Sequence, residues 1–119
     1  MKKIISLLLI LCFVVACSSG EKFKLITTNE AIKLIEEGAT VLDVRTVEEY
    51  DREHIKGAIN IPVDIIDTID LDKDLDIIVY CQSGIRSQKA VERLAQLGYK
   101  KLYNLDGGLL NWGGDLEEK

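Results

Sequence analysis

Residues 77–87, with the sequence IIVYCQSGIRS, decide the fold that we expect for this chain. The run Asp76–Tyr80 is short, apolar and β-branched after its first residue, which is typical of a buried strand. The apolar residues that follow have helical spacing: Ala90, Val91, Leu94, Ala95 and Leu97. The pattern predicts a strand and a helix joined by a short loop, and Cys81 is the first residue of that loop.

The cysteine lies just before the expected helix, where a negative charge is favoured. The unpaired N–H groups and the positive end of the helix dipole would point at the loop. Loops of this kind bind anions and lower the pKa of a thiol. Arg86 adds a positive charge. We predict that Cys81 is a nucleophile in an anion-binding loop made of Gln82, Ser83, Gly84, Ile85, Arg86 and Ser87.

Strands and helices alternate on both sides of this segment. We expect strands at residues 23–26, 41–45, 58–61, 76–80 and 101–105. We expect helices at residues 28–37, 47–52, 63–69 and 87–97, and a short one carrying Trp112. The alternation predicts an α/β fold with a parallel sheet flanked by helices on both faces. In such sheets the site lies beyond the carboxyl ends of the strands, which is where Cys81 is expected.

Two of the expected helices begin with a capping box. Thr27 is followed by Glu30, and Thr46 is followed by Glu49, so each threonine can bond the backbone N–H of a glutamate that bonds back. Between the ordered elements we expect a loop at residues 54–57. The polar residues 113–119 are expected to form a frayed tail.

The composition is that of a single globular domain. The chain has 119 residues, of which 47% are apolar and 29% charged. The formal net charge of −5 gives no reason to expect a nucleic-acid partner. One histidine and one free cysteine in the domain argue against a zinc site, and no other metal or cofactor is expected. We expect a monomer.

The first sixteen residues have the pattern of an export signal. Lys2 and Lys3 precede the apolar residues 4–16. At about 1.5 Å per residue this run is too short to cross a hydrocarbon core of about 30 Å. We therefore expect residues 1–16 to be removed during export. Cys12 would leave with them.

Residues 14–17, with the sequence VVAC, resemble the lipobox of bacterial lipoproteins, in which cleavage leaves a lipid-modified cysteine as the first residue. We expect residues 17–22 to be a lipidated tether. The exported domain, residues 23–116, would then be anchored to the extracytoplasmic side of a bacterial membrane through Cys17. A plain signal peptide cut near Ala16 is the alternative. After acylation Cys81 is the only thiol left, and a lone thiol in an exported protein is a reactive group or an intermolecular partner.

Five motifs resemble those of single-domain rhodaneses, in the same order and at the same spacing. They are residues 42–45 (LDVR), 48–50 (EEY), 54–62 (HIKGAINIP), 80–87 (YCQSGIRS) and 105–108 (LDGG) with Trp112. The resemblance runs from Phe23 to Trp112. It implies a five-stranded parallel sheet between helices and sulfur transfer through a persulfide on Cys81.

The implied partners are a small sulfur-containing anion as donor and a thiophilic acceptor, with cyanide, a small thiol or a thiol protein as candidates. Family members that use thiosulfate well often carry basic residues directly after the cysteine, whereas this chain has Gln82 and Ser83. The donor therefore stays open. Near the site, Asp43 and Arg45 are expected to lock a strand end by hydrogen bonds, and His54 to be a structural residue of its loop.

Two other functions stay open. One is a persulfide carrier or binding module with little turnover of its own. The other is a phosphatase on the same fold, although phosphatases of the cysteine class place five residues between cysteine and arginine. Only four residues separate Cys81 from Arg86.

Overall fold

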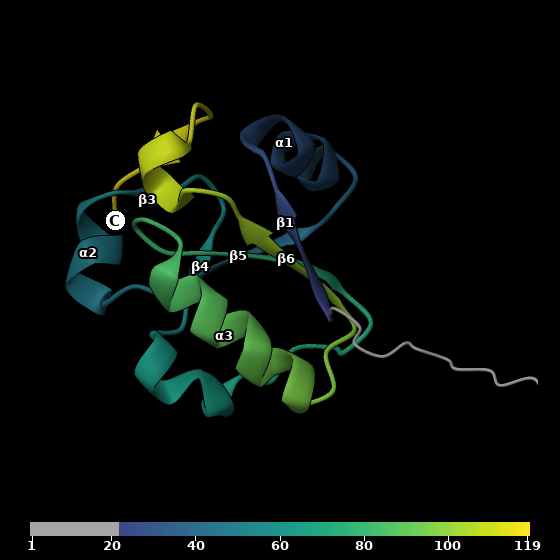
Figure 1. The fold of residues 1–119 in the computed structure, drawn as a ribbon. Helices are drawn as coiled ribbons and strands as arrows, with labels where there is room; N and C mark the ends of the chain where they lie inside the picture. Colours follow the sequence, from purple (N-terminus) through teal and green to yellow (C-terminus); the bar gives the residue numbers. More distant parts are fainter. Residues whose placement is uncertain (1–21) are drawn as a thin grey trace, which may run out of the picture.

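The computed structural model describes residues 22–119 (Figure 1). The centre of this region is a five-stranded parallel sheet, as predicted, and its strands lie in the order β1-β6-β5-β2-β4. The strands are β1 (Phe23–Ile26), β2 (Thr40–Asp43), β4 (Ile59–Asn60), β5 (Asp76–Tyr80) and β6 (Lys101–Leu105). The expected signal peptide, and the tether up to residue 21 with Cys17, lie outside the described residues.

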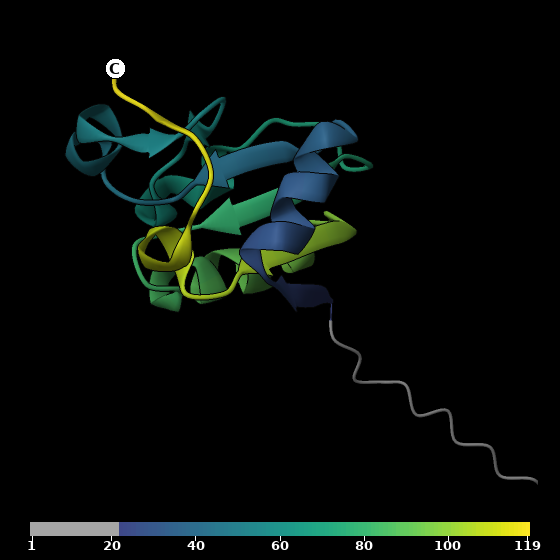
Figure 2. The same cartoon turned by 90° about the horizontal axis from the view of Figure 1, so that it is seen from above.

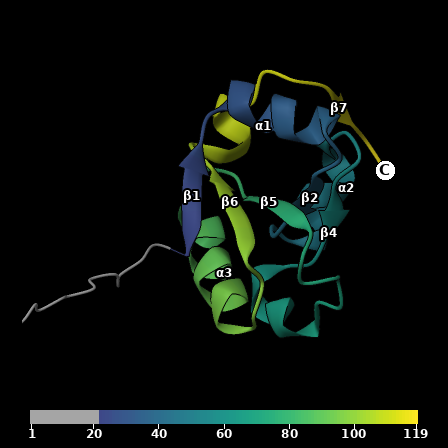
Figure 3. The same cartoon turned by 90° about the vertical axis from the view of Figure 1, so that its right-hand side faces the viewer.

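Helices cover both faces of the sheet, also as predicted (Figures 2 and 3). On one face lie α1 (Thr28–Glu36) and α2 (Val47–Arg52), which pack on residues such as Ile78 and Leu105. On the other lie α3 (Ile85–Gln96) and the 3-10 helix η2 (Val63–Thr68), which cover Leu42, Ile77 and Val79. The β-branched residues of β5 are buried on both faces, as expected for a central parallel strand.

Both predicted capping boxes are present. The Thr27 side chain accepts a hydrogen bond from the backbone N–H of Glu30, whose carboxylate accepts one from the backbone N–H of Thr27. Thr46 and Glu49 make the same reciprocal pair at the start of α2. Within residues 22–119, none of the helices has the length and apolar composition needed to cross a membrane.

The expectation that residues 113–119 form a frayed tail is wrong. Leu116–Glu117 forms a short strand, β7, which pairs antiparallel with β3 (His54–Ile55), within the segment expected to be a loop. The backbone N–H of Gly57 also donates to the Glu117 carboxylate at 2.9 Å. Strands of two residues are too short to show a periodicity in the sequence, so only the backbone pairing reveals them.

The last helical segment also differs from the expectation. The 3-10 helix η3 (Gly108–Asn111) ends one residue before Trp112, whose backbone is extended. The Trp112 Nε1–H donates to the carbonyl of Asp115 at 3.2 Å, which turns the chain back toward β3. The C-terminal segment therefore lies over the same edge of the sheet as the loop after β5 (Figure 1).

Candidate active site

The Cys81 side chain lies at the carboxyl end of β5 and is only 1% exposed. Its Sγ accepts hydrogen bonds from the backbone N–H groups of Gly84 at 3.1 Å and Ser87 at 3.3 Å. Gly84 is the N-cap of α3 and has a φ of 111°, a conformation that glycine adopts without a steric penalty. The structure therefore brings Cys81, Gly84 and Ser87 together at the start of α3.

These contacts decide the acidity of the thiol. Burial raises the pKa of the Cys81 thiol, because a buried thiolate loses its hydration. Hydrogen bonds from Ser87, and from the backbone N–H groups of Gly84 and Ser83, act in the opposite direction and outweigh burial. The net pKa of Cys81 lies below its ordinary value, so the loop favours the thiolate, which is the nucleophilic form.

A polar chain that the sequence analysis missed orients the Ser87 hydroxyl. In the thiol state the Cys81 Sγ–H points to Ser87 Oγ at 3.5 Å, and the Ser87 hydroxyl donates to Asn104 Oδ1 at 2.6 Å. The Asn104 amide in turn donates to Gln88 Oε1 at 3.2 Å. Asn104 lies in β6 and is 3% exposed. A polar residue between apolar neighbours of a strand was the only signal for it in the sequence.

Arg86 lies in the first turn of α3 and forms a two-pronged ion pair. Its Nη1 and Nη2 lie 2.8 and 3.1 Å from the two carboxylate oxygens of Glu49 in α2. The hydrogen bond from Arg86 lowers the pKa of Glu49 to about 2. Glu49 raises the pKa of Arg86, and the Cys81 charge contributes less to the same effect. The positive charge predicted to serve the loop is thus shared with a carboxylate 37 residues away in the chain.

The other loop residues lie at the surface of the site. Gln82 Oε1 accepts a hydrogen bond from Arg45 Nη1 at 3.4 Å, and Ser83 is exposed. Ile85 is 71% exposed, although it is apolar. A polar hollow adjoins Gln82 on one side of the loop, lined also by Arg45, Glu49, Arg52, Glu53 and Leu109.

The carbonyls of the loop are held by the C-terminal segment. The backbone N–H groups of Leu109 and Leu110 donate to the carbonyls of Cys81 at 2.9 Å and Gln82 at 3.1 Å. Gly108 packs directly on these carbonyls, since a Cβ there would lie 2.5 Å from the Cys81 oxygen. The N–H groups of the loop therefore face the sulfur while its carbonyls face η3.

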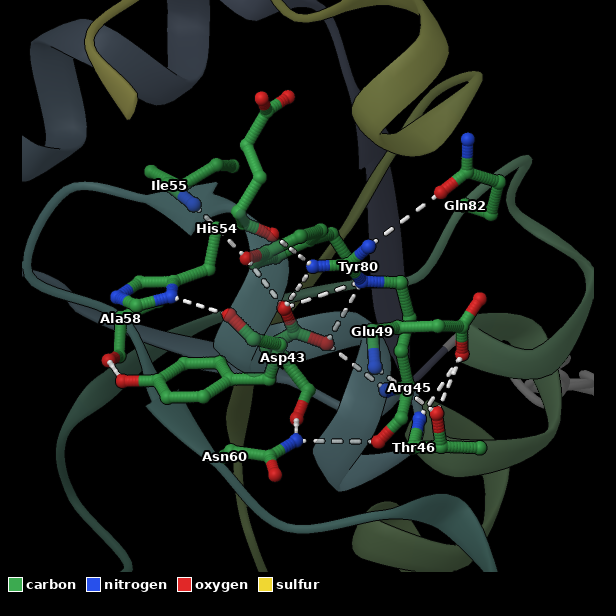
Figure 4. A network of polar contacts seen from close by, with 12 residues as sticks. Asp43, Arg45, Thr46, Glu49, His54, Ile55, Ala58, Asn60, Tyr80 and Gln82 are labelled. Atoms are coloured by element: carbon green, nitrogen blue, oxygen red, sulfur yellow. Dashed lines mark hydrogen bonds and ion pairs between the residues drawn. The ribbon is translucent and has the colours of Figure 1, made fainter. Parts of the chain in front are cut away.

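Asp43 is the centre of a buried polar network beside the loop (Figure 4). Its carboxylate accepts hydrogen bonds from the backbone N–H and the guanidinium of Arg45, at 2.8 to 3.1 Å, and from the Tyr80 hydroxyl at 2.6 Å. Arg45 also donates to the carbonyl of Glu53 at 2.6 Å, and the backbone N–H of Ile55 donates to the Tyr80 hydroxyl at 3.0 Å. The network joins the ends of β2, β5 and α2 to β3.

Burial and Asp43 together keep the Tyr80 hydroxyl protonated. Both raise the pKa of Tyr80 far above its ordinary range. Burial lowers the pKa of Arg45, but the hydrogen bonds and the charge of Asp43, with smaller contributions from Tyr80 and Glu49, together outweigh burial and raise the net pKa. Asp43 and Arg45 therefore form a fixed ion pair whose hydrogen bonds are made within the protein, at 0% and 3% exposure. This arrangement suits the locking of a strand end better than catalysis.

His54 is buried beneath α2. Its ring stacks on Tyr50, with centroids 3.7 Å apart and planes 7° from parallel. Nδ1 lies 2.7 Å from the Tyr50 carbonyl, and Nε2 lies 3.4 Å from the Glu117 carboxylate of β7. Both ring nitrogens thus have partners in the scaffold. In the part of the chain from 22 to 119, no group of three or more His, Cys, Asp and Glu residues is arranged to hold a metal ion.

Comparison with known proteins agrees with this geometry. Residues 27–115 match the model of the rhodanese-like domain. The chain is 34% identical over 84 residues to a putative sulfur carrier protein, YrkF, of Bacillus subtilis, covering 69% of this chain and 45% of that protein. It is 33% identical over 93 residues to the thiosulfate sulfurtransferase GlpE of Coxiella burnetii, covering 76% of this chain and 87% of that protein. This chain thus spans less than half of YrkF.

A solved structure shares the fold. The rhodanese-like domain protein of Staphylococcus aureus superimposes with a TM-score of 0.72 at 37% identity, over 81% of this chain and 98% of that one.

The contacts of Cys81 lead to a prediction about its acidity. Ser87→Ala removes the hydroxyl, which can turn from Asn104 to the thiolate, but keeps the backbone N–H, so the Cys81 pKa should rise. The pH dependence of iodoacetamide alkylation measures this shift. Ser83→Ala is the matched control, because Ser83 acts through its backbone N–H and the profile should not move. Equal profiles for the two variants would contradict a role for the Ser87 hydroxyl.

Proposed function

Because this chain belongs to the family of rhodanese-like domains, we propose that it is a sulfurtransferase that works through a persulfide on Cys81. The observation that carries the proposal is the position of Cys81 Sγ, which is buried and accepts hydrogen bonds from two backbone N–H groups at the start of α3. Such a set of donors suits a sulfur anion, first as thiolate and then as persulfide. The sulfurtransferase name of the Coxiella relative supports the same reaction.

The reaction has two displacement steps. The Cys81 thiolate attacks the outer sulfur of a donor such as thiosulfate; a new S–S bond forms, the S–S bond of the donor breaks, and the electron pair leaves with sulfite. An acceptor nucleophile, cyanide or a thiolate, then attacks the outer sulfur of the persulfide, and the Cys81 thiolate leaves. Each step conserves electrons between donor, cysteine and acceptor, so no metal or organic cofactor takes part.

The loop contributes to both steps by holding negative charge. The N–H groups of Gly84 and Ser87 are fixed by α3 and need no rearrangement when the charge develops. Because the Cys81 side chain is only 1% exposed, the added sulfur of the persulfide would extend the reactive atom toward the mouth of the loop. The acceptor would attack there.

A persulfide carrier is the second candidate. The near-complete burial of Cys81 and the name of the Bacillus relative, a putative sulfur carrier protein, favour it. A carrier would load one sulfur and keep it until a partner protein arrives. Steady thiocyanate production from thiosulfate and cyanide would identify the enzyme, and a stable persulfide with negligible turnover would identify the carrier.

The first test removes the nucleophile. Cys81→Ser should abolish thiocyanate formation and the gain of one sulfur in the intact mass after thiosulfate treatment. Peptide mapping of the wild type should place that sulfur on Cys81 rather than on Cys12 or Cys17. Circular dichroism checks that the variant folds, which we expect because serine differs from cysteine by one atom. A folded variant that retains activity would refute the persulfide mechanism.

The second test concerns the ion pair between Arg86 and Glu49. Glu49→Gln keeps an acceptor for the capping box but frees the charge of Arg86, so kcat/KM for thiosulfate should rise roughly tenfold, equivalent to about 1.4 kcal/mol. Arg86→Ala should lower it. Glu48→Gln makes the same charge change at an exposed neighbour and should have little effect. If Glu49→Gln and Glu48→Gln behave alike, Arg86 takes no part in donor binding.

We also propose that Cys17 carries a lipid that anchors the domain outside the cytoplasm. The support is the sequence of residues 14–17 after the apolar run. Cells fed a fatty-acid analogue should label the wild-type protein, whereas Cys17→Ala should be unlabelled. Cys12→Ala, which changes a cysteine within the expected signal peptide, is the control and should keep the label. Equal labelling of wild type and Cys17→Ala would refute the anchor.

A further inference from the structure

Five exposed lysines gather at the corner of the sheet that lies farthest along the strands from Cys81. Four of them line one hollow together with Phe23 and Tyr103: Lys22, Lys24, Lys100 and Lys101. Lys73 completes the group, since its ammonium lies 5.0 Å from the ring centroid of Tyr99, which also lines the hollow. We call Lys22, Lys24, Lys73, Lys100 and Lys101 the basic corner.

The topology fixes where this corner lies. In the parallel sheet Phe23 pairs with Leu102 and Asp76 with Lys101, so the starts of β1, β5 and β6 share one edge. Cys81 leaves β5 at the opposite edge. Figure 3 shows the same separation, with the start of β1 beside the end of α3 and far from η3. The chain enters the domain at the basic corner, and the reactive sulfur lies at the other end of the strands.

The basic corner stands out against an acidic protein. The chain has a formal net charge of −5. The ion pairs formed among residues 22–119 involve Arg45, His54, Arg86 and Arg93, and none of the five lysines. The positive charges of the basic corner therefore form no ion pair with a carboxylate within residues 22–119.

Acidic residues limit the extent of this surface. Asp76 lies beside Lys101 in the sheet and accepts a hydrogen bond from the Tyr103 hydroxyl. Asp72 and Asp74 flank Lys73 in the sequence. Five lysines thus outnumber three aspartates. Toward α1, Glu30 and Glu37 line a neighbouring hollow with Lys24 and Lys33, so the positive surface ends there.

We propose that the basic corner rests on the anionic headgroups of the membrane that holds the protein. The proposed acyl anchor at Cys17 lies only five residues before Lys22, a reach of at most about 18 Å. The tether thus brings the corner near the lipid surface, where each lysine strengthens attraction to anionic lipid roughly fivefold. Tyr103 adds a half-buried aromatic ring of a type enriched at membrane interfaces, and Phe23 lines the same hollow.

The proposal assigns an orientation to the enzyme. With the basic corner on the headgroups, the sheet stands with its carboxyl edge away from the bilayer. The loop of Cys81 then opens to the aqueous side. Sulfur donors and acceptors would be water-soluble molecules or the exposed thiols of other proteins, and lipid-dissolved compounds would not reach the sulfur.

Lysine acetylation on vesicles tests the proposal with the full chain. The protein is bound to vesicles of phosphatidylcholine alone or with phosphatidylglycerol, and acetylation rates are measured residue by residue by mass spectrometry. Both vesicles hold the same N-terminal segment, so a difference reports the charge of the lipid. Rates at the basic corner should fall about fivefold or more on phosphatidylglycerol and recover in about 1 M salt, where the Debye length is about 3 Å. Rates at Lys56, Lys89 and Lys119 should not change.

A matched pair of variants completes the test. Lys24→Gln/Lys100→Gln/Lys101→Gln should abolish the protection of Lys22 and Lys73 on phosphatidylglycerol, whereas Lys56→Gln/Lys89→Gln/Lys119→Gln should preserve it. All six residues are exposed, so both variants should fold. Equal rates on the two vesicles, or protection spread over all lysines, would overturn the proposal. Slower acetylation of the basic corner in the presence of duplex DNA, but not on phosphatidylglycerol vesicles, would also overturn the proposal. The basic corner would then bind a soluble polyanion. Fatty-acid labelling at Cys17 reports the anchor separately.

Discussion

The carboxylate of Asp43 is the constraint on which the site depends. It is fully buried and accepts hydrogen bonds from Arg45 and from the Tyr80 hydroxyl. Tyr80 and Cys81 are consecutive, and their side chains enter the cores on opposite faces of the sheet. Fixing the Tyr80 hydroxyl therefore fixes the register in which the chain leaves β5 and turns Cys81 toward α3. Removing one member of such a buried pair typically costs about 3–5 kcal/mol, a large share of a domain's stability of about 5–15 kcal/mol.

Charge is divided between two layers around the sulfur. The inner layer consists of backbone N–H groups, which carry partial charges and are held by α3. The outer layer consists of whole charges already matched in pairs, Arg45 with Asp43 and Arg86 with Glu49. A sulfur anion in the loop therefore contacts the backbone N–H dipoles directly, whereas the guanidinium of Arg86 lies farther out and is paired with Glu49. This division suits the single negative charge of the Cys81 thiolate, which the backbone N–H groups of Gly84 and Ser87 contact directly.

The parts of the fold that local sequence controls were predictable. The strand before Cys81 and the two capping boxes depend on residues within four positions of each other, and the structure has them where the pattern places them. The missed features join distant segments. Glu49 finds Arg86 and Asn104 finds Ser87 only after the sheet has formed, and β7 pairs with β3 through backbone groups that every sequence possesses. Side-chain type shows what a residue can bind, whereas the topology selects its partner.

The hydrogen bonds from η3 to the loop have a consequence for the order in which the site folds. The carbonyls of Cys81 and Gln82 find their donors in Leu109 and Leu110, near the end of the chain. A polypeptide is made from its N-terminus, so these two donors are synthesised after the loop that they support. Until then the carbonyls of Cys81 and Gln82 lack their partners in η3. The loop can therefore reach its final geometry only after η3 has been made and has folded against it.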